Sequence, residues 1–147
     1  MAEKFKMYVS ANLHLVRDGG ILLLRRHNTG WKDGLYGVVA GHVDGNETIA
    51  DAMVREAKEE ADIDLVATDL RVVHAQHRIT ADREYIDFHL IPAHWEGEPT
   101  NLEPEKCDDL SWHPINQLPE NIIPYMRIAF DCIQNNIFYS EYREPGT

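Results

Sequence analysis

The sequence is poor in the features that mark secreted and membrane proteins. It has only two cysteines, Cys107 and Cys132, in 147 residues, which is too few for the disulfide framework of a small secreted domain. Its longest apolar run covers residues 21–24, whereas a membrane-spanning helix needs about 20 apolar residues. The N-terminal stretch MAEKFKMYVS also lacks the apolar run of a secretory signal. We therefore expect a cytoplasmic protein with reduced thiols and no membrane partner.

Basic residues are also scarce. The chain has 14 lysines and arginines against 25 aspartates and glutamates, and its net charge is −11. Binding of a nucleic acid polymer requires Lys and Arg side chains that neutralise phosphates, so we expect no such partner. An acidic protein can nevertheless bind a phosphorylated small molecule if a metal ion supplies the positive charge. A length of 147 residues suits one hydrophobic core, so residues 1–147 are predicted to form a single domain.

The distribution of apolar residues predicts strands mixed with two helices. The Asp-Gly-Gly turn after Arg17 separates two apolar runs and predicts a hairpin, whereas residues 28–35 are rich in Gly and Asn and are predicted to form a loop. Pro124 suits the first turn of the second helix. The predicted helices cover residues 48–61 and 122–137, and the predicted strands cover residues 6–16, 21–27, 36–41, 70–79, 85–95 and 110–115. This mixture favours an α/β or α+β layer architecture.

The first predicted helix is unusually acidic. Thr48 with Asp51 three residues later resembles a capping box and predicts the helix start. At about 100° per residue, Glu56, Glu59 and Glu60 share one arc of the helix, separate from an arc of small apolar side chains. Glu56 and Glu60 repel each other at this spacing. A solvated helix face is one interpretation, and a site for a hard cation such as Mg²⁺ or Mn²⁺ is the other, because such cations prefer oxygen ligands.

The same segment carries the spacing of a known motif. The residues in question are Gly41, Glu47, Arg55, Glu56, Ala57, Glu59, Glu60 and Ile63. They match the Nudix box, and the order and length of the whole chain also resemble a Nudix (MutT-like) hydrolase. Asp62 stands where the box has glycine. That position ends the helix with positive φ, which Asp adopts less readily than Gly, so we expect a small loss of stability there and no loss of chemistry.

The resemblance implies both a fold and a chemistry. The fold would be an α/β/α sandwich with a mixed β-sheet between helices, and the reaction would be Mg²⁺-dependent hydrolysis of a phosphoanhydride in a nucleoside diphosphate-linked compound, with Mn²⁺ as a substitute. Glu56, Glu60 and the carbonyl of Gly41 would be metal ligands. Glu59 would be a ligand or would orient the attacking water, and Arg55 would hold a glutamate in place by charge-assisted hydrogen bonds.

The general base is predicted to be a glutamate of the box. Glu105, in the acidic loop sequence EPEKC, is the rival as base or as a further metal ligand. A solvated loop acid is the alternative interpretation of Glu105.

Four residues outside the box are candidate substrate contacts. Arg26 resembles the arginine that triphosphate-hydrolysing members place beside the base, although an ordinary cation at a strand end is the alternative. Trp31 offers an aromatic face for a nucleobase, or it fixes its own loop. Asn121 has donors and an acceptor that suit a purine edge, or it caps a helix, and Tyr125 is placed to pack on the face of the base.

The family also has subgroups that the sequence does not match. ADP-ribose members carry a proline after the box, and no proline lies between Ile63 and Ile91. Diadenosine polyphosphate members favour a tyrosine where this chain has Thr80 and Ala81. We therefore predict hydrolysis of a nucleoside triphosphate, including an oxidised or noncanonical one, to monophosphate and pyrophosphate.

Two other classes of function remain as alternatives to that prediction. One is a hydrolase of ADP-ribose or of dinucleoside polyphosphates, and the other is a non-catalytic Nudix module that senses a nucleotide. The chain keeps all four box glutamates and Arg55, which favours catalysis. A small-molecule nucleotide is the predicted partner, and the sequence is compatible with a monomer or a homodimer.

Overall fold

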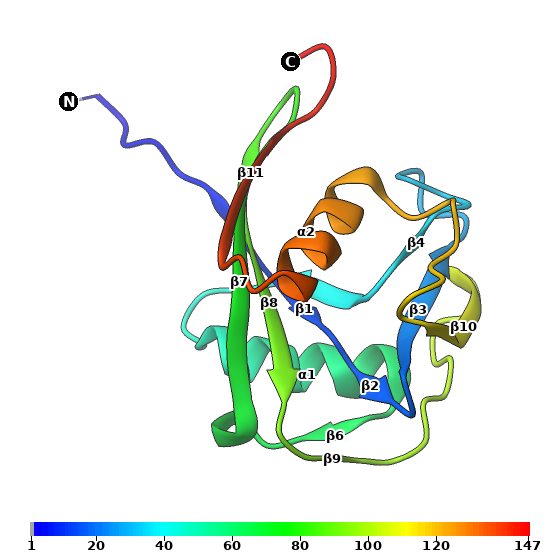
Figure 1. Cartoon of the computed structure of the whole chain (residues 1–147). Coiled ribbons are helices and arrows are strands. Elements are labelled where there is room, and N and C mark those ends of the chain that lie inside the picture. The colour runs from blue at the N-terminus through cyan, green and yellow to red at the C-terminus, as the bar shows by residue number, and fades with distance from the viewer. Residues whose placement is uncertain (1) are drawn as a thin grey trace.

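A computed structural model describes residues 2–147 of the chain (Figure 1). Its largest sheet is mixed and has the strand order β11-β7-β8-β1-β5, in which β1 is parallel to β8 and β11 is parallel to β7. The strands of this sheet are β1 (Tyr8–Leu13), β5 (Val39–His42), β7 (Leu70–Ile79), β8 (Glu84–Pro92) and β11 (Tyr139–Arg143).

Two smaller sheets complete the β structure. A four-stranded antiparallel sheet contains the predicted hairpin, and a short two-stranded sheet closes the lower end of the view in Figure 1. The strands of the first are β2 (Val16–Arg17), β3 (Gly20–Arg26), β4 (Tyr36–Gly37) and β10 (Cys107–Pro114), and those of the second are β6 (Asp64–Leu65) and β9 (Trp95–Glu96). A 3-10 turn at Ala67–Asp69 precedes β7.

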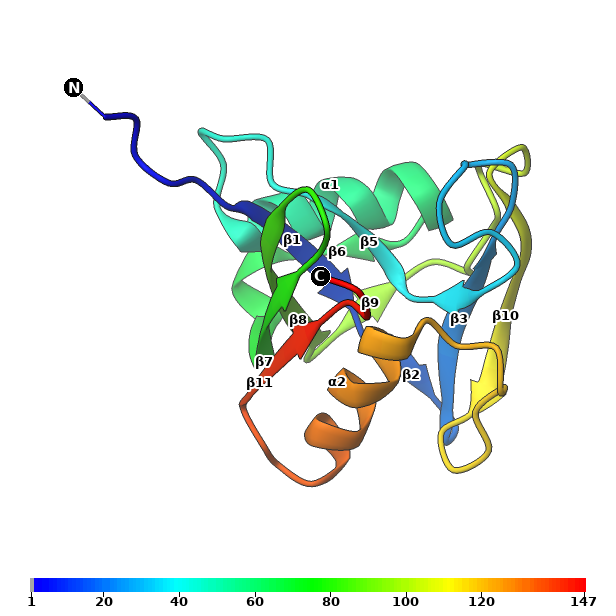
Figure 2. The ribbon, with the colours of Figure 1, turned by 90° about the horizontal axis from the view of Figure 1, so that it is seen from above.

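Two helices cover opposite faces of the mixed sheet. Helix α1 (Ile49–Ala61) packs against β1 and β5, whereas α2 (Pro124–Gln134) packs against β7 and β11. Seen from above, the sheet lies between them (Figure 2). Each helix contributes to its own buried cluster, one around Met53 and Ala57 and the other around Met126 and Phe130. The predicted α/β/α sandwich with a mixed sheet is therefore confirmed. Within residues 2–147, no helix is long and apolar enough to cross a membrane.

The ends of α1 follow from its sequence. The Thr48 hydroxyl accepts a hydrogen bond from the Asp51 N–H, and the Asp51 carboxylate accepts one from the Thr48 N–H, so the capping box is present. Asp62 ends the helix in the left-handed region with φ 57°. Both the predicted helix start and the predicted positive φ at the glycine position of the box are confirmed.

The sequence predicts Ala50, Val54, Ala57 and Ala61 as the apolar face of α1, and of these only Ala57 and Ala61 are fully buried. The buried residues are Ala52, Met53, Ala57 and Ala61. On the helical wheel Ala52 and Met53 lie on either side of Glu56, about 40° and 60° away. The acidic arc and the apolar arc therefore overlap, and Glu56 is drawn toward the sheet. This overlap explains why a carboxylate of this helix is desolvated.

The structure also corrects several predicted elements. The strand β11 was not predicted, and α2 ends at Gln134, three residues earlier than residue 137. The sequence of the strand at residues 85–95 alternates apolar and polar residues, and in β8 the polar side is buried, since Asp87 and His89 are only 1% and 0% exposed. The reason is that α2 covers that face of the sheet. Cys107 and Cys132 are both free thiols.

Candidate active site

Arg55 fixes the loop that precedes α1. Its Nη2 donates to Oε1 of Glu47 at 2.8 Å and to the carbonyl of His42 at 3.2 Å, while its Nη1 donates to Oε1 of Glu56 at 2.7 Å. Glu47 also accepts the N–H of Asp44 at 2.9 Å. One guanidinium therefore joins both ends of residues 42–47 to the helix, which is the geometry expected of a positioning residue.

Gly41 lies directly against the carboxyl group of Glu56. A Cβ at position 41 would lie 2.1 Å from the carboxyl carbon of Glu56, which is far inside van der Waals contact. The glycine is therefore required by this close approach of β5 to α1 and not by an unusual φ angle. Its backbone is brought beside the acidic side chains as a result.

Glu60 is the most perturbed carboxyl group of the helix. Burial, and then the nearby charge of Glu56, raise the pKa of Glu60 to about 8. Oε2 of Glu60 accepts the N–H of Ala40 at 3.2 Å. Burial also raises the pKa of Glu56, although the ion pair with Arg55 opposes that shift. The cause is the placement of these acids on the buried side of α1, where the ionised form is disfavoured.

Four glutamates line one cavity of about 260 Å³, which we call the acidic cavity: Glu56, Glu59, Glu60 and Glu103. Gly41 and Arg26 also line it. Glu59 is its most accessible box glutamate, with a side chain 58% exposed and 3.7 Å from Arg55. Within residues 2–147, no three His, Cys, Asp or Glu side chains already converge as a cluster of metal ligands. All the carboxylates and the Gly41 backbone nevertheless provide hard oxygen donors, which suit Mg²⁺ or Mn²⁺.

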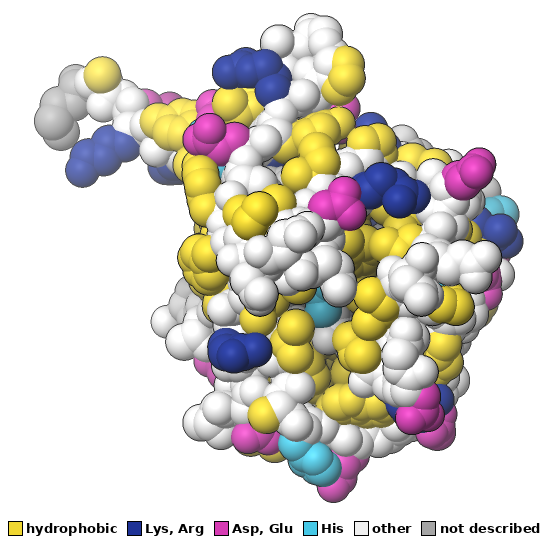
Figure 3. Space-filling view, viewed as in Figure 1, with side chains coloured by type: hydrophobic (Ala, Val, Ile, Leu, Met, Phe, Trp, Pro, Cys, Tyr) yellow, Lys and Arg dark blue, Asp and Glu magenta, His cyan; other side chains and the backbone are white. Residues whose placement is uncertain are grey.

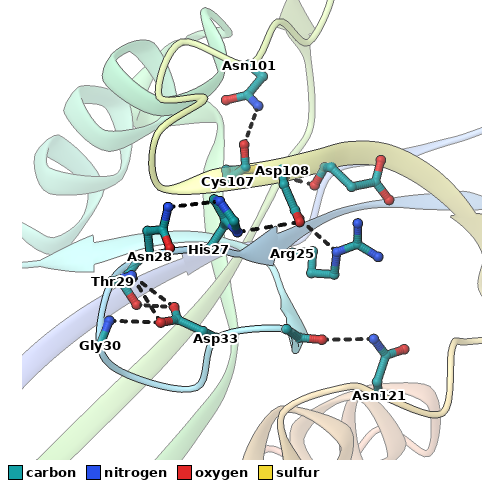
Figure 4. Close-up of polar contacts among 12 residues, drawn as sticks. Arg25, His27, Asn28, Thr29, Gly30, Asp33, Asn101, Cys107, Asp108 and Asn121 are labelled. Atoms are coloured by element: carbon teal, nitrogen blue, oxygen red, sulfur yellow. Dashed lines mark hydrogen bonds and ion pairs between the residues drawn. The ribbon is translucent and has the colours of Figure 1, made fainter.

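The structure does not bring Glu105 together with the box glutamates. Glu105 is exposed and does not line the acidic cavity, whereas Glu103 does. The loop before β10 is folded by Asn101, whose amide donates to the carbonyl of Cys107 at 2.7 Å (Figure 4) and whose Oδ1 accepts the N–H of Glu103 at 3.1 Å. These bonds fix the turn so that Glu103 lines the cavity and Glu105 lies outside it.

A larger cavity of about 590 Å³ adjoins the acidic one. We call it the aromatic cavity because Trp31, Tyr85 and Tyr125 line it. The two cavities share three lining residues, namely Arg26, Ala40 and Gly41. The guanidinium of Arg26 lies 4.7 Å from the ring centre of Trp31. Three of the four predicted substrate contacts (Arg26, Trp31 and Tyr125) are therefore brought together in one cavity.

Asn121 is the exception among those predicted contacts. It does not line the aromatic cavity, and its amide donates to the carbonyl of Gly34 at 3.0 Å (Figure 4). The same close-up shows the carboxylate of Asp33 accepting bonds from Thr29 and Gly30. Asn121 therefore anchors residues 28–35 to the start of α2, and the structure does not bring it together with the other three predicted contacts.

Arg78 is a cavity residue that the sequence analysis missed. Its guanidinium lies between two rings, 3.8 Å from the centre of Tyr85 and 4.1 Å from that of Tyr125. Asp87 holds it through two bonds of 2.6 and 3.1 Å, and Ser10 donates to the same carboxylate at 2.6 Å. Arg78 is rigidly fixed at the wall of the cavity by these contacts. Both strands were predicted from the sequence, and when they pair Arg78 lies diagonal to Asp87.

The structure thus combines an acidic cavity and an adjoining aromatic cavity on an α/β/α sandwich. The family model of the NUDIX domain matches residues 7–131, so the chain belongs to the Nudix family. The structure is similar to that of a MutT NUDIX hydrolase from Burkholderia pseudomallei, with a TM-score of 0.79, 28% identity, and coverage of 86% of this chain and 98% of the other. A MutT protein from Bacillus halodurans shares the fold, with a TM-score of 0.75 and 20% identity over 94% of this chain and 92% of the other.

Curated relatives are similar over part of their length. An NAD-capped RNA hydrolase NudC from Vibrio atlanticus is 28% identical over 122 residues, which cover 83% of this chain and 43% of the relative. A NudC from Pectobacterium carotovorum is 30% identical over 105 residues, or 71% of this chain and 38% of the relative. This chain therefore spans less than half the length of these relatives.

Proposed function

We propose that the chain is a divalent-cation-dependent hydrolase that cleaves a phosphoanhydride bond in a nucleoside diphosphate-linked compound. The observation that carries this proposal is the junction of two cavities at Arg26, Ala40 and Gly41. A substrate that spans this junction has its base among aromatic side chains and its phosphates beside carboxylates. Only a compound with an apolar ring at one end and a metal-binding anion at the other suits both environments.

The metal would be held by oxygen donors of the acidic cavity. Glu56, Glu59, Glu60, Glu103 and the carbonyl of Gly41 fit Mg²⁺ or Mn²⁺ by donor chemistry. When bound, the cation supplies the positive charge that lets a pyrophosphate approach these carboxylates, and it polarises the phosphoryl group. Arg55 keeps Glu47 and Glu56 in position, because it is bonded to both.

We assign the general base to Glu59. It is the most accessible glutamate of the box and is not fixed by a close hydrogen bond to Arg55. In the proposed reaction a water molecule attacks one phosphorus, its proton passes to the Glu59 carboxylate, and the bond from that phosphorus to the leaving phosphate oxygen breaks. Glu60 is the ligand whose ionisation depends most on a nearby cation, because its pKa is about 8.

The favoured substrate is a nucleoside triphosphate, with monophosphate and pyrophosphate as products. Trp31 and Tyr125 provide ring faces for the base, and Arg26 reaches both cavities. A second candidate is a dinucleotide pyrophosphate related to NAD, which is favoured by the similarity to relatives named NAD-capped RNA hydrolases. We expect small-molecule substrates in either case because the net charge of −11 disfavours a nucleic acid polymer. The two free thiols favour a cytoplasmic location.

The test is a panel of nucleoside triphosphates, NAD, ADP-ribose and diadenosine polyphosphates, each incubated with Mg²⁺. Phosphate release with and without added pyrophosphatase, together with product masses, identifies the bond that is cleaved. Glu60→Gln and Glu103→Gln should abolish turnover. Glu105→Gln is the matched control and should retain the wild-type rate. Nucleotide binding without turnover of any compound would overturn the proposal in favour of a sensing module.

A further inference from the structure

Strand β11 forms one edge of the mixed sheet and leaves half of its backbone groups without a strand partner. Its hydrogen bonds to β7 include those from the Ala75 N–H to the Phe138 carbonyl and from the Glu144 N–H to the Ile79 carbonyl, at 2.8 and 2.9 Å. Alternate residues of a strand direct their N–H and C=O groups to opposite edges. The residues whose groups point to the free edge are therefore Tyr139, Glu141 and Arg143.

The surroundings of this edge are apolar, and two of its exposed side chains are charged. Ile137, Phe138 and Tyr139 are 50%, 56% and 49% exposed, and apolar side chains reach the surface on the side of the molecule that carries β11 and α2 (Figure 3). Glu141 and Arg143 are also exposed. In the described part of the chain Arg143 forms no ion pair. Charged side chains commonly protect a sheet edge against association, but the two exposed charges of β11 have opposite signs, so a second copy of the same edge can match them.

We propose that β11 pairs antiparallel with β11 of a second copy of this chain, so that one sheet runs through a two-fold symmetric dimer. Such a contact is self-complementary, since each residue meets its partner twice. It satisfies the free backbone groups of Glu141 and Arg143 on both edges.

Charge selects the register of this pairing. With Tyr142 on the two-fold axis, Glu141 of each copy lies opposite Arg143 of the other. The backbone N–H and C=O groups of both residues point to the free edge, so the two residues form a hydrogen-bonded pair. Opposite charges in such cross-strand positions attract, and like charges repel. With Glu141 on the axis instead, the two glutamates lie opposite each other. With Ser140 on the axis, both arginines are left beyond the paired segment.

The dimer contact is continuous with a wall of the aromatic cavity. Glu144 directly follows β11 and lines that cavity. Its carboxylate pairs with Lys32 of the loop at residues 28–35, at 3.2 Å. Pairing of β11 therefore restrains a residue that lines the aromatic cavity.

Charge reversal tests both the contact and its register. Sedimentation of the full chain over a concentration series should show a dimer for the wild type. Glu141→Arg and Arg143→Glu should each raise the dissociation constant at least about tenfold. The double variant, with both reversals, should return it close to the wild-type value. Arg71→Glu and Glu96→Arg are matched controls, because they reverse exposed strand charges outside β11, and both should remain dimeric.

A cross-link gives an independent measurement of the register. Residues on the axis form a non-hydrogen-bonded pair with Cα atoms about 4.5 Å apart, which a disulfide can bridge. Tyr142→Cys should therefore form a disulfide-linked dimer under mild oxidation, and the wild type under the same oxidant should not. A monomeric wild type overturns the proposal, as does a dimer that is unchanged by the reversals or not rescued by the double variant. No substrate is needed, so these results are independent of the proposed hydrolysis.

Discussion

Replacement of Glu60 by Gln removes one titrating group while keeping a similar shape. The carboxylate accepts the Ala40 N–H, and the amide oxygen of Gln can accept the same bond. Folding raises the pKa of Glu60 from 4.5 to about 8 because the group is buried. A carboxyl group with a raised pKa binds its proton more tightly in the folded protein. The free energy of unfolding therefore falls as pH rises from about 4.5 to about 8, and the loss is complete above that range.

The size of the effect follows from the two pKa values. Between pH 6 and pH 9 the difference in proton binding lowers the stability of the wild type by about 3 kcal/mol at most. Relaxation and water entry around a partly exposed group reduce this figure, so we expect a difference of about 1–3 kcal/mol between wild type and Glu60→Gln. A bound divalent cation favours the ionised form, and saturation at about 100 times its Kd adds about 2.7 kcal/mol to the wild type.

The assay is urea unfolding at pH 6 and pH 9, with EDTA and with Mg²⁺. Without the cation, Glu60→Gln should lose less stability than the wild type as pH rises, and it should be the more stable protein at pH 9. With the cation, the wild type should gain stability and the variant should gain little. Parallel pH dependence of the two proteins would show that Glu60 does not titrate in this range. Equal stabilisation by Mg²⁺ would remove Glu60 from the ligand set.

Three further substitutions test other parts of the site. Gly41→Ala places a Cβ 2.1 Å from the Glu56 carboxyl carbon. The affinity for Mg²⁺, measured by calorimetry, and the turnover rate should each fall at least about tenfold. An unchanged affinity would contradict the close approach. Asp62→Gly relieves the strain of a left-handed φ of 57° but removes an ion pair with Lys58. We expect a net gain of about 0.5 kcal/mol in the free energy of unfolding and a Tm higher by about 1–2 °C. A lower Tm would refute this balance. Arg78→Lys keeps the charge but cannot form both guanidinium bonds to Asp87. KM should therefore rise about tenfold with a smaller change in kcat. A large fall in kcat with an unchanged KM would place Arg78 in the chemical step.

The acidic half of the site was predictable because its parts are close in sequence. Residues from Gly41 to Ile63 form one strand end, one loop and one helix, and helical geometry alone relates Glu56 to Glu60. The choice between Glu103 and Glu105 was not predictable in this way. It depends on the hydrogen bonds of Asn101 in an irregular loop. In such a loop no fixed periodicity relates the position of a residue in the sequence to the direction of its side chain.

The aromatic half depends on contacts between distant segments. Trp31 and Tyr125 come together only because residues 28–35 lie beside the start of α2. The strand β11 escaped prediction for a related reason: Tyr139–Arg143 is short, and it alternates exposed and half-buried residues without an apolar run. Its conformation is set by pairing with β7, which local propensity does not report.

The two cavities divide the chain into parts that can change separately. Arg26, Ala40 and Gly41 are the residues that line both, whereas Arg78, Tyr85 and Glu144 serve the aromatic cavity without contributing to the acidic one. Mutation of the hairpin formed by β7 and β8, or of the C-terminal segment, can therefore alter which molecule enters while the hydrolytic apparatus stays intact. During evolution such a division lets a new specificity arise in small steps, each of which preserves a working enzyme.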